Sequence, residues 1–117
     1  MEPSAYLPLR EPTLFILLSL SADNKHGYAI LQDVEALSDG RVELSTSTLY
    51  EALARLLDQG LIARVEGPAA ADDQNPGRPR KVYRLTPSGR RVLNAEVVRL
   101  QGLVATAQQR LRAAGSC

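Results

Sequence analysis

The stretch from Ser45 to Ile62, STSTLYEALARLLDQGLI, constrains the fold more than any other part of the sequence. Its leucines recur at helical spacing, which predicts an amphipathic helix over residues 45–59. The helix starts with hydroxyl side chains and is followed directly by a β-branched segment, which favours a helix that is presented to a partner. The leucines expected on its buried face are Leu49, Leu53, Leu56 and Leu57.

Both ends of this helix carry sequence signals. Ser45 is the expected N-cap, because a serine oxygen can accept from the free N–H groups of the first turn. Thr48 and Glu51, three residues apart, form a competing capping-box pair. Gly60 is the expected stop, because glycine adopts the left-handed conformation without strain.

Hydrophobic periodicity and turn signals predict the remaining elements. Residues 12–22 are nearly all apolar, so the helix expected there must be covered on every side. The loop expected between the two downstream strands is rich in Gly, Pro, Ala and Asp. The other expected elements are a helix over 26–38, a turn at Asp39-Gly40, a short strand or extended connector over 41–44, strands over 61–66 and 80–85 around the loop 67–79, and a last helix starting at Thr86-Pro87.

The last helix carries an apolar seam with spacings of 4, 3, 4, 3 and 4, an a/d pattern of about two and a half heptads. The seam could pack on its own domain or on a second copy of the chain. We favour a homodimer, because this seam and the apolar first helix exceed what one small domain can cover. The expected interface residues are Leu93, Val97, Leu100, Val104, Ala107 and Leu111, with Phe15 from the first helix.

Length and composition exclude several classes of protein. A chain of 117 residues forms one modest core. Cys117 is the only cysteine, which excludes an internal disulfide and fits a reducing, cytoplasmic compartment. The apolar run 13–20 is far shorter than the ~20 residues that span a bilayer, and Glu2-Pro3 does not resemble the basic start of a signal peptide. One His and one Cys cannot supply a metal site, and neither a catalytic constellation nor a cofactor loop is evident, so we expect no metal, no cofactor and no enzyme.

Charge is divided unevenly along the chain. Residues 1–77 carry 5 basic and 12 acidic side chains, whereas residues 78–117 carry 9 basic and 1 acidic. Six basic residues and no acidic one lie within 78–91. This asymmetry indicates contact with a polyanion on one face; the alternative is a solvated basic helix and loop.

A polar helix start beside a basic hairpin is the arrangement of a winged helix-turn-helix that binds double-stranded DNA. We therefore expect a mainly α fold with a small β-hairpin (α+β), with the winged domain over residues 8–86 and a C-terminal dimerisation helix over 87–113. The alternative, a winged-helix module that binds another protein, is disfavoured by the basic wing. The residues expected to contact DNA are Ser45, Thr46, Ser47, Thr48, Tyr50 and Arg55 on the recognition helix, and Arg78, Arg80 and Lys81 on the wing. Because only Arg55 is basic on that helix, groove shape is expected to carry part of the specificity.

Three segments resemble the PadR family of bacterial transcriptional regulators. They are His26-Gly27-Tyr28, then Thr48-Leu49-Tyr50 with its following leucines and Gly60-Leu61-Ile62, and finally residues 77–86 (GRPRKVYRLT) with Gly89. They occur in the family's order and spacing over roughly residues 10–95, and the single short final helix is similar to the compact subgroup of the family.

The resemblance implies a homodimeric repressor that binds a pseudo-palindromic operator and is released by a small lipophilic effector. It also implies that Tyr28 is a candidate phosphate contact and that Gly27 allows close packing, while His26 is expected to cap its helix. The chain departs from the family pattern at Ser47, where a smaller residue is common. It also lacks Trp and has no aromatic residue in the last helix, which disfavours a stacked, flat effector; an aliphatic cavity or no effector remains open.

Overall fold

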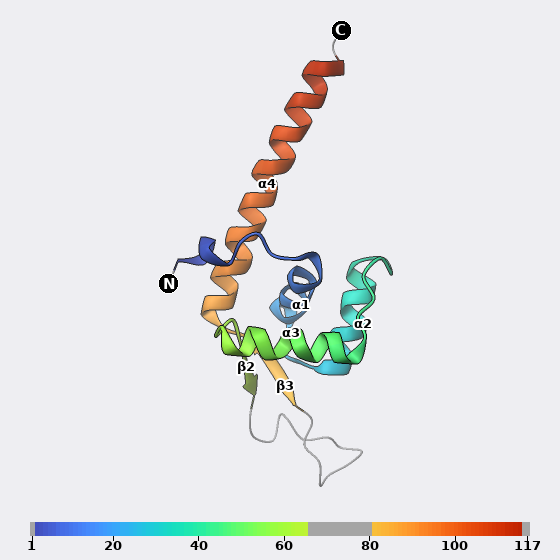
Figure 1. Ribbon diagram of the computed structural model, residues 1–117, viewed down its shortest axis with the longest axis vertical. Coiled ribbons are helices and arrows are strands. Elements are labelled where there is room, and N and C mark those ends of the chain that lie inside the picture. Colours follow the sequence, from blue (N-terminus) through green and yellow to red (C-terminus); the bar gives the residue numbers. More distant parts are fainter. Residues whose placement is uncertain (1, 66–80, 116–117) are drawn as a thin grey trace.

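The structure, a computed structural model, describes residues 2–65 and 81–115 (Figure 1). Four α-helices and a small antiparallel sheet make up the described part, which is the predicted α+β fold class. The loop 67–79, with Arg78, and Arg80 lie outside the described residues. The elements in chain order are η1 (Pro3–Tyr6), α1 (Glu11–Ala22), β1 (Lys25–His26), α2 (Gly27–Leu37), α3 (Thr46–Asp58), β2 (Ile62–Val65), β3 (Val82–Leu85) and α4 (Pro87–Gly115).

The helix starts are capped largely as the sequence predicts. The Ser45 Oγ accepts a hydrogen bond from the Thr48 backbone N–H at 3.1 Å, so Ser45 and not the competing pair is the N-cap of α3. His26 caps α2, since its Nδ1 accepts from the Ala29 N–H at 3.3 Å. Gly60 ends α3 with a φ of +73°, the left-handed conformation expected for a glycine stop.

The sheet has three strands in the order β1-β3-β2, all antiparallel. The predicted hairpin corresponds to β2 and β3, which pair in register from Ile62 opposite Leu85 to Val65 opposite Val82. The prediction missed β1, which pairs only Lys25 and His26 with β3. A two-residue strand has no alternating pattern of its own, because its formation depends on the neighbouring strand.

The junction between α3, β2 and α4 is held by Thr86. Its Oγ1 accepts from the Gly89 N–H at 3.0 Å, which caps α4, and donates to the Gly60 carbonyl at 2.7 Å. A β-carbon on Gly89 would lie 2.0 Å from the Leu61 carbonyl oxygen. Only glycine therefore allows α4 to start this close to the strand backbone.

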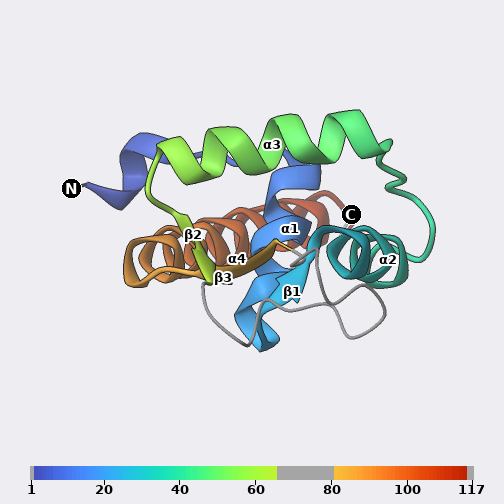
Figure 2. The same ribbon diagram turned by 90° about the horizontal axis from the view of Figure 1, so that it is seen from below.

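The core is aliphatic and is organised around α1, which packs against α2, α4 and β3. Figure 2 shows α1 inside the fold, with α3 across one side of it. The chain's own elements cover most of α1, and Phe15 is partly buried against the core. The most deeply buried apolar residues are Ile16, Leu17, Leu20, Ile30, Val34, Leu49, Leu53, Leu56, Leu61, Ile62, Tyr83, Val92 and Leu93.

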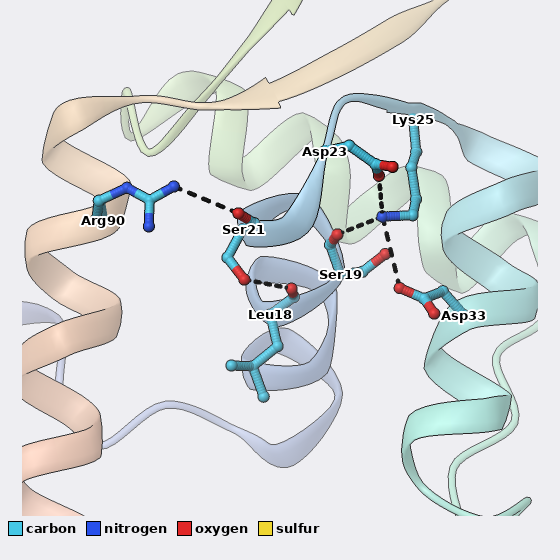
Figure 3. A network of polar contacts seen from close by, with 7 residues as sticks. All are labelled: Leu18, Ser19, Ser21, Asp23, Lys25, Asp33 and Arg90. Atoms are coloured by element: carbon cyan, nitrogen blue, oxygen red, sulfur yellow. Dashed lines mark hydrogen bonds and ion pairs between the residues drawn. The ribbon is translucent and has the colours of Figure 1, made fainter.

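A polar network at the end of α1 fixes it to the neighbouring elements (Figure 3). The Lys25 ammonium donates to the Ser19 carbonyl at 2.5 Å and lies 3.6 Å from the Asp33 carboxylate on α2. On the other side, Arg90 of α4 donates to the Ser21 carbonyl at 3.4 Å. Cations at a helix C-terminus satisfy free carbonyls and interact favourably with the helix dipole. The network therefore sets where β1 and the start of α2 lie.

Residues 2–10, which we call the N-terminal arm, pack along α4 through η1. The arm is fastened by Glu96, a carboxylate that is only 1% exposed. Glu96 accepts from the Leu9 N–H at 2.7 Å and from the Arg99 Nε at 2.5 Å. The hydrogen bond from Arg99 is the main reason that the pKa of Glu96 lies below its ordinary value; the Leu9 N–H acts in the same direction, while burial opposes both. The sequence did not predict this contact.

Candidate DNA-binding surface

The start of α3 is an exposed cluster of hydroxyl groups. Besides capping the helix, the Ser45 Oγ donates to the Thr48 Oγ1 at 2.8 Å and lies 3.2 Å from the Ser47 Oγ. Ser45, Thr46, Ser47 and Thr48 are all exposed. Free backbone N–H groups and hydroxyls at a helix N-terminus are suited to phosphate oxygens and to base edges. The structure thus brings together the four hydroxyl residues predicted to contact DNA.

Tyr50 lies one turn into α3 and packs on the first turn of α2. A β-carbon on Gly27 would lie 2.5 Å from the Tyr50 hydroxyl oxygen and 3.0 Å from Cζ, so the ring occupies space that only a glycine leaves. The Tyr50 side chain nevertheless remains 44% exposed. Tyr28, next to Gly27, is 66% exposed. Two tyrosine side chains are therefore available to a partner beside the helix start.

Tyr83 and Arg64 extend this surface onto the sheet. Tyr83 is 2% exposed, and burial raises the pKa of its hydroxyl above the ordinary value; the nearby Tyr50 adds to the rise, and Arg64 opposes it through its charge and a hydrogen bond. Arg64 itself is exposed on β2. Arg64 is thus an exposed cation near Tyr83 that sequence reasoning missed. A single arginine between the apolar residues Ala63 and Val65 of a short strand has no distinctive pattern.

The described part of the basic hairpin is also open to a partner. Lys81, which precedes β3, and Arg84 within β3 are both exposed, so neither side chain is enclosed by the domain. Figure 1 shows the open ends of β2 and β3 directed away from the far end of α4.

Arg55 lies on a different side of α3 from Tyr50. Five residues at about 100° each separate them by about 140° around the helix axis. Arg55 and Gln59 line a hollow together with the N-terminal arm, rather than the edge beside α2 and the sheet. Arg55 follows Thr48 by seven residues, so it lies on the side of α3 that carries Thr48 and away from Tyr50.

The residues predicted at a dimer interface fall into two groups. Leu93 is only 4% exposed and belongs to the protomer's own core, which corrects its assignment to the interface. The remaining seam lies further along α4, where Val97, Val104 and Leu111 are 39%, 52% and 71% exposed. Every residue from 101 to 115 is exposed in the single chain, and Figure 1 shows this half of α4 extending beyond the rest of the fold. Two further exposed apolar side chains on α4, Val98 and Leu103, were not predicted.

Residues 2–65 and 81–115 contain neither a candidate metal site nor a candidate membrane-spanning helix. This part of the chain contains no group of three or more His, Cys, Asp or Glu side chains that could hold a metal ion. None of its helices is long and apolar enough to cross a lipid bilayer.

One comparison with known proteins, the match to a family model, identifies a family for this chain. The sequence model described as "Transcriptional regulator PadR-like family" matches residues 16–95. No curated protein matches the chain. Among solved structures, it is similar to a PadR family transcription regulator from Clostridium difficile R20291, with a TM-score of 0.69 and 24% identity over 87% of this chain and 99% of that one.

Two further solved structures are similar over most of their length. A transcriptional regulator from Clostridium thermocellum has a TM-score of 0.67 and 23% identity, covering 84% of this chain and 87% of that one. A PadR family transcriptional regulator from Eggerthella lenta DSM 2243 has a TM-score of 0.60 and 28% identity, covering 86% and 84%. The arrangement of helices and sheet is therefore shared with these proteins.

Proposed function

This chain belongs to the PadR-like family of transcriptional regulators, and from that premise we propose that it is a homodimeric repressor that binds a pseudo-palindromic operator. The observation that carries the proposal is the exposed hydroxyl start of α3 with Tyr50, one turn further on, seated on Gly27 of α2. Arg64 is exposed on β2, the strand that follows α3. A helix start that fits the major groove thus has phosphate-binding groups on its flank.

The side chains of the proposed surface differ in the part of the DNA that their chemistry suits. Ser45, Thr46, Ser47 and Thr48 carry hydroxyls, and the threonines also carry methyl groups, which suit phosphates, mixed base edges and the thymine methyl. Tyr50, Tyr28 and Arg64 supply backbone contacts that fix the register of α3 in the groove. With few groups that read bases, sequence-dependent groove shape carries part of the specificity.

The wing supplies most of the non-specific attraction. Lys81 is exposed at its base, and Arg78 and Arg80 extend the same basic run. Each phosphate that such a residue neutralises releases counterions, so affinity falls steeply with salt. Arg55, which is exposed on the side of α3 that carries Thr48, remains a proposed contact from the recognition helix.

The second half of α4 provides the proposed dimer surface. Leu100 and Val104 line a shallow apolar groove on the helix, and a second hollow of about 650 Å³ lies between the N-terminal arm and α4, lined by Leu7 and Val98. Exposed apolar surface of this extent on a lone helix favours burial by a second copy. We propose residues 87–113 as the dimerisation helix and 8–86 as the DNA-binding domain. The remaining proposed interface residues are Phe15, Val97, Ala107 and Leu111.

Release of the DNA by a small lipophilic effector stays a prediction from the family resemblance. The hollow between the arm and α4 has an apolar lining where such a compound would compete with the partner subunit. Its described lining contains no aromatic side chain to stack a flat ring.

Fluorescence anisotropy with DNA from upstream of the chain's own gene tests the proposal. The titration is repeated over a range of salt concentrations and with a scrambled duplex of the same length. Tight binding to the upstream duplex alone, with a steep salt dependence, supports a sequence-specific regulator. Absence of binding to either duplex at low salt overturns the proposal and favours a winged-helix module that binds another protein.

A further inference from the structure

A hollow of about 260 Å³ lies between the N-terminal arm and the second half of α3. One wall comes from the arm and the first turn of α1, and the other from the end of α3 and the start of the following strand. Its lining includes Tyr6, Arg10, Thr13, Arg55, Leu56 and Gln59. Of the proposed DNA contacts, Arg55 is the one in this lining.

Two arginines face this hollow without a described partner. Arg10 and Arg55 make no ion pair or side-chain hydrogen bond with another described residue, whereas Arg41 pairs with Glu11 and Arg99 with Glu96. The described lining contains no Asp or Glu. Both arginines are exposed to solvent, and a bound anion would supply the negative charge that the described lining lacks.

The rest of the lining indicates what kind of anion fits. The lining also contains hydrogen-bond donors other than the guanidinium groups, which can bind further oxygens of the anion. They are Thr13, Gln59 and the Tyr6 hydroxyl. Leu56 and Leu61 are buried side chains that form an apolar floor. The guanidinium group of an arginine can donate two parallel hydrogen bonds to two oxygens of one phosphate. The charges of two arginines also balance the double negative charge of a phosphate monoester. We propose that this hollow binds a small phosphate monoester with a compact apolar body.

Such a ligand would connect two parts of the molecule that serve different purposes. The arm is fastened to α4 by the bond from the Leu9 N–H to Glu96, and Arg55 belongs to α3. A phosphate held by Arg10 and Arg55 therefore ties the DNA-reading helix to the dimerisation helix. This regulatory consequence rests on the proposed function, whereas the binding site itself does not.

Isothermal titration calorimetry with phenyl phosphate, carried out on the full chain without DNA, tests the site. We expect one phenyl phosphate per protomer, weaker binding of inorganic phosphate and no binding of phenol. Arg10→Gln and Arg55→Gln should each weaken phenyl phosphate by about tenfold or more, since each removes a charge-assisted bond. Arg10→Lys and Arg55→Lys should give smaller losses, because lysine keeps the charge without the fork. Arg110→Gln on the far part of α4 is the matched control and should bind as the wild type does.

Three results would overturn the site: no heat of binding with phenyl phosphate, binding that is unchanged in both glutamine variants, or equal binding of phenol. Circular dichroism melting of each variant separates lost binding from lost folding. Anisotropy on DNA distinguishes the source of the phosphate. If the glutamine variants lower DNA affinity and its salt dependence while phenyl phosphate does not bind, the hollow takes a DNA backbone phosphate and the proposal is wrong. If phenyl phosphate binds through both arginines but the chain binds no DNA, the site stands and the proposed function falls.

Discussion

The hydroxyl of Tyr50 on α3 closes over Gly27 on α2, so that a β-carbon at Gly27 would lie 2.5 Å from its oxygen. This contact sets the direction in which the tyrosine leaves the recognition helix. A glycine at the first position of α2 is thus tied to a side chain on the candidate DNA-binding surface, although 23 residues separate them (50 − 27).

We predict that Gly27→Ala lowers DNA affinity several-fold and leaves the fold nearly intact. Overpacking usually costs about 1–3 kcal/mol, but here the clash meets the end of a half-exposed ring that can rotate away. The displaced hydroxyl would then lose the proposed phosphate contact, which Tyr50→Phe also removes. Anisotropy and thermal melting measure the two effects. The Gly27→Ala/Tyr50→Phe double variant should bind DNA no more weakly than the worse single variant; additive losses would show that the two residues act separately.

Gly89→Ala should strongly destabilise the protein. The added β-carbon would lie 2.0 Å from the Leu61 carbonyl oxygen, and neither backbone can retreat without opening the junction of α4 and β2. We expect a loss of about 3 kcal/mol in the free energy of unfolding, measured by urea denaturation. Gly102→Ala on the same helix is the control, because nothing lies within 4 Å of its added β-carbon. It should stabilise the helix by up to about 1 kcal/mol; similar losses at both glycines would contradict the close approach.

Glu96 should make stability depend on pH in the acid range. Its pKa is lowered in the folded chain, chiefly by the Arg99 hydrogen bond, so the carboxylate stabilises the fold above its unfolded pKa of about 4.3 and this contribution is lost as pH falls through the lower folded pKa. Glu96→Gln should reduce the free energy of unfolding at pH 7 by about 1.5–3 kcal/mol. Urea denaturation at several pH values should show the difference between wild type and variant shrinking below pH ~4.3. A difference that stays constant with pH would contradict the arrangement.

The local signals in the sequence were sufficient for the helices and their caps. Ser45, Gly60 and Thr86 cap or end their helices through neighbours within a few residues, so these roles could be derived from spacing alone. The hydroxyl cluster at the start of α3 followed from the same signals. The PadR resemblance, confirmed by the family match, correctly linked these elements to one fold.

What the sequence did not predict depends on contacts between distant residues. β1 exists because β3 pairs with it, and the arm is fixed by a bond between Leu9 and Glu96, 87 residues apart. Leu93 continues the heptad pattern of α4, yet the domain covers that part of the helix, so periodicity alone could not separate core from interface. Arg64 was missed because a single exposed arginine on a short strand has no distinctive pattern.

Val104→Glu should dissociate the proposed dimer without unfolding the protomer. Val104 is 52% exposed in the single chain, so a charge there costs little until a partner helix buries it. Sedimentation velocity should show a shift from dimer to monomer, and DNA affinity should fall with it. Gln109→Glu, on the opposite side of α4 from the seam, adds the same charge and should remain dimeric. A Val104→Glu protein that stays dimeric would place the interface elsewhere.

Arg64 provides the most direct test of the candidate DNA-binding surface, because its role follows from the structure and not from the sequence pattern. Arg64 is exposed on β2, and its charge opposes the rise that burial causes in the pKa of the Tyr83 hydroxyl. If it neutralises one DNA phosphate, Arg64→Gln should weaken binding to every duplex alike and reduce the slope of log affinity against log salt by about 0.9. Arg110→Gln removes the same charge at the far end of α4 and should leave the slope unchanged. An unchanged slope in Arg64→Gln would show that Arg64 does not neutralise a DNA phosphate. The proposed DNA-binding surface would then not include β2.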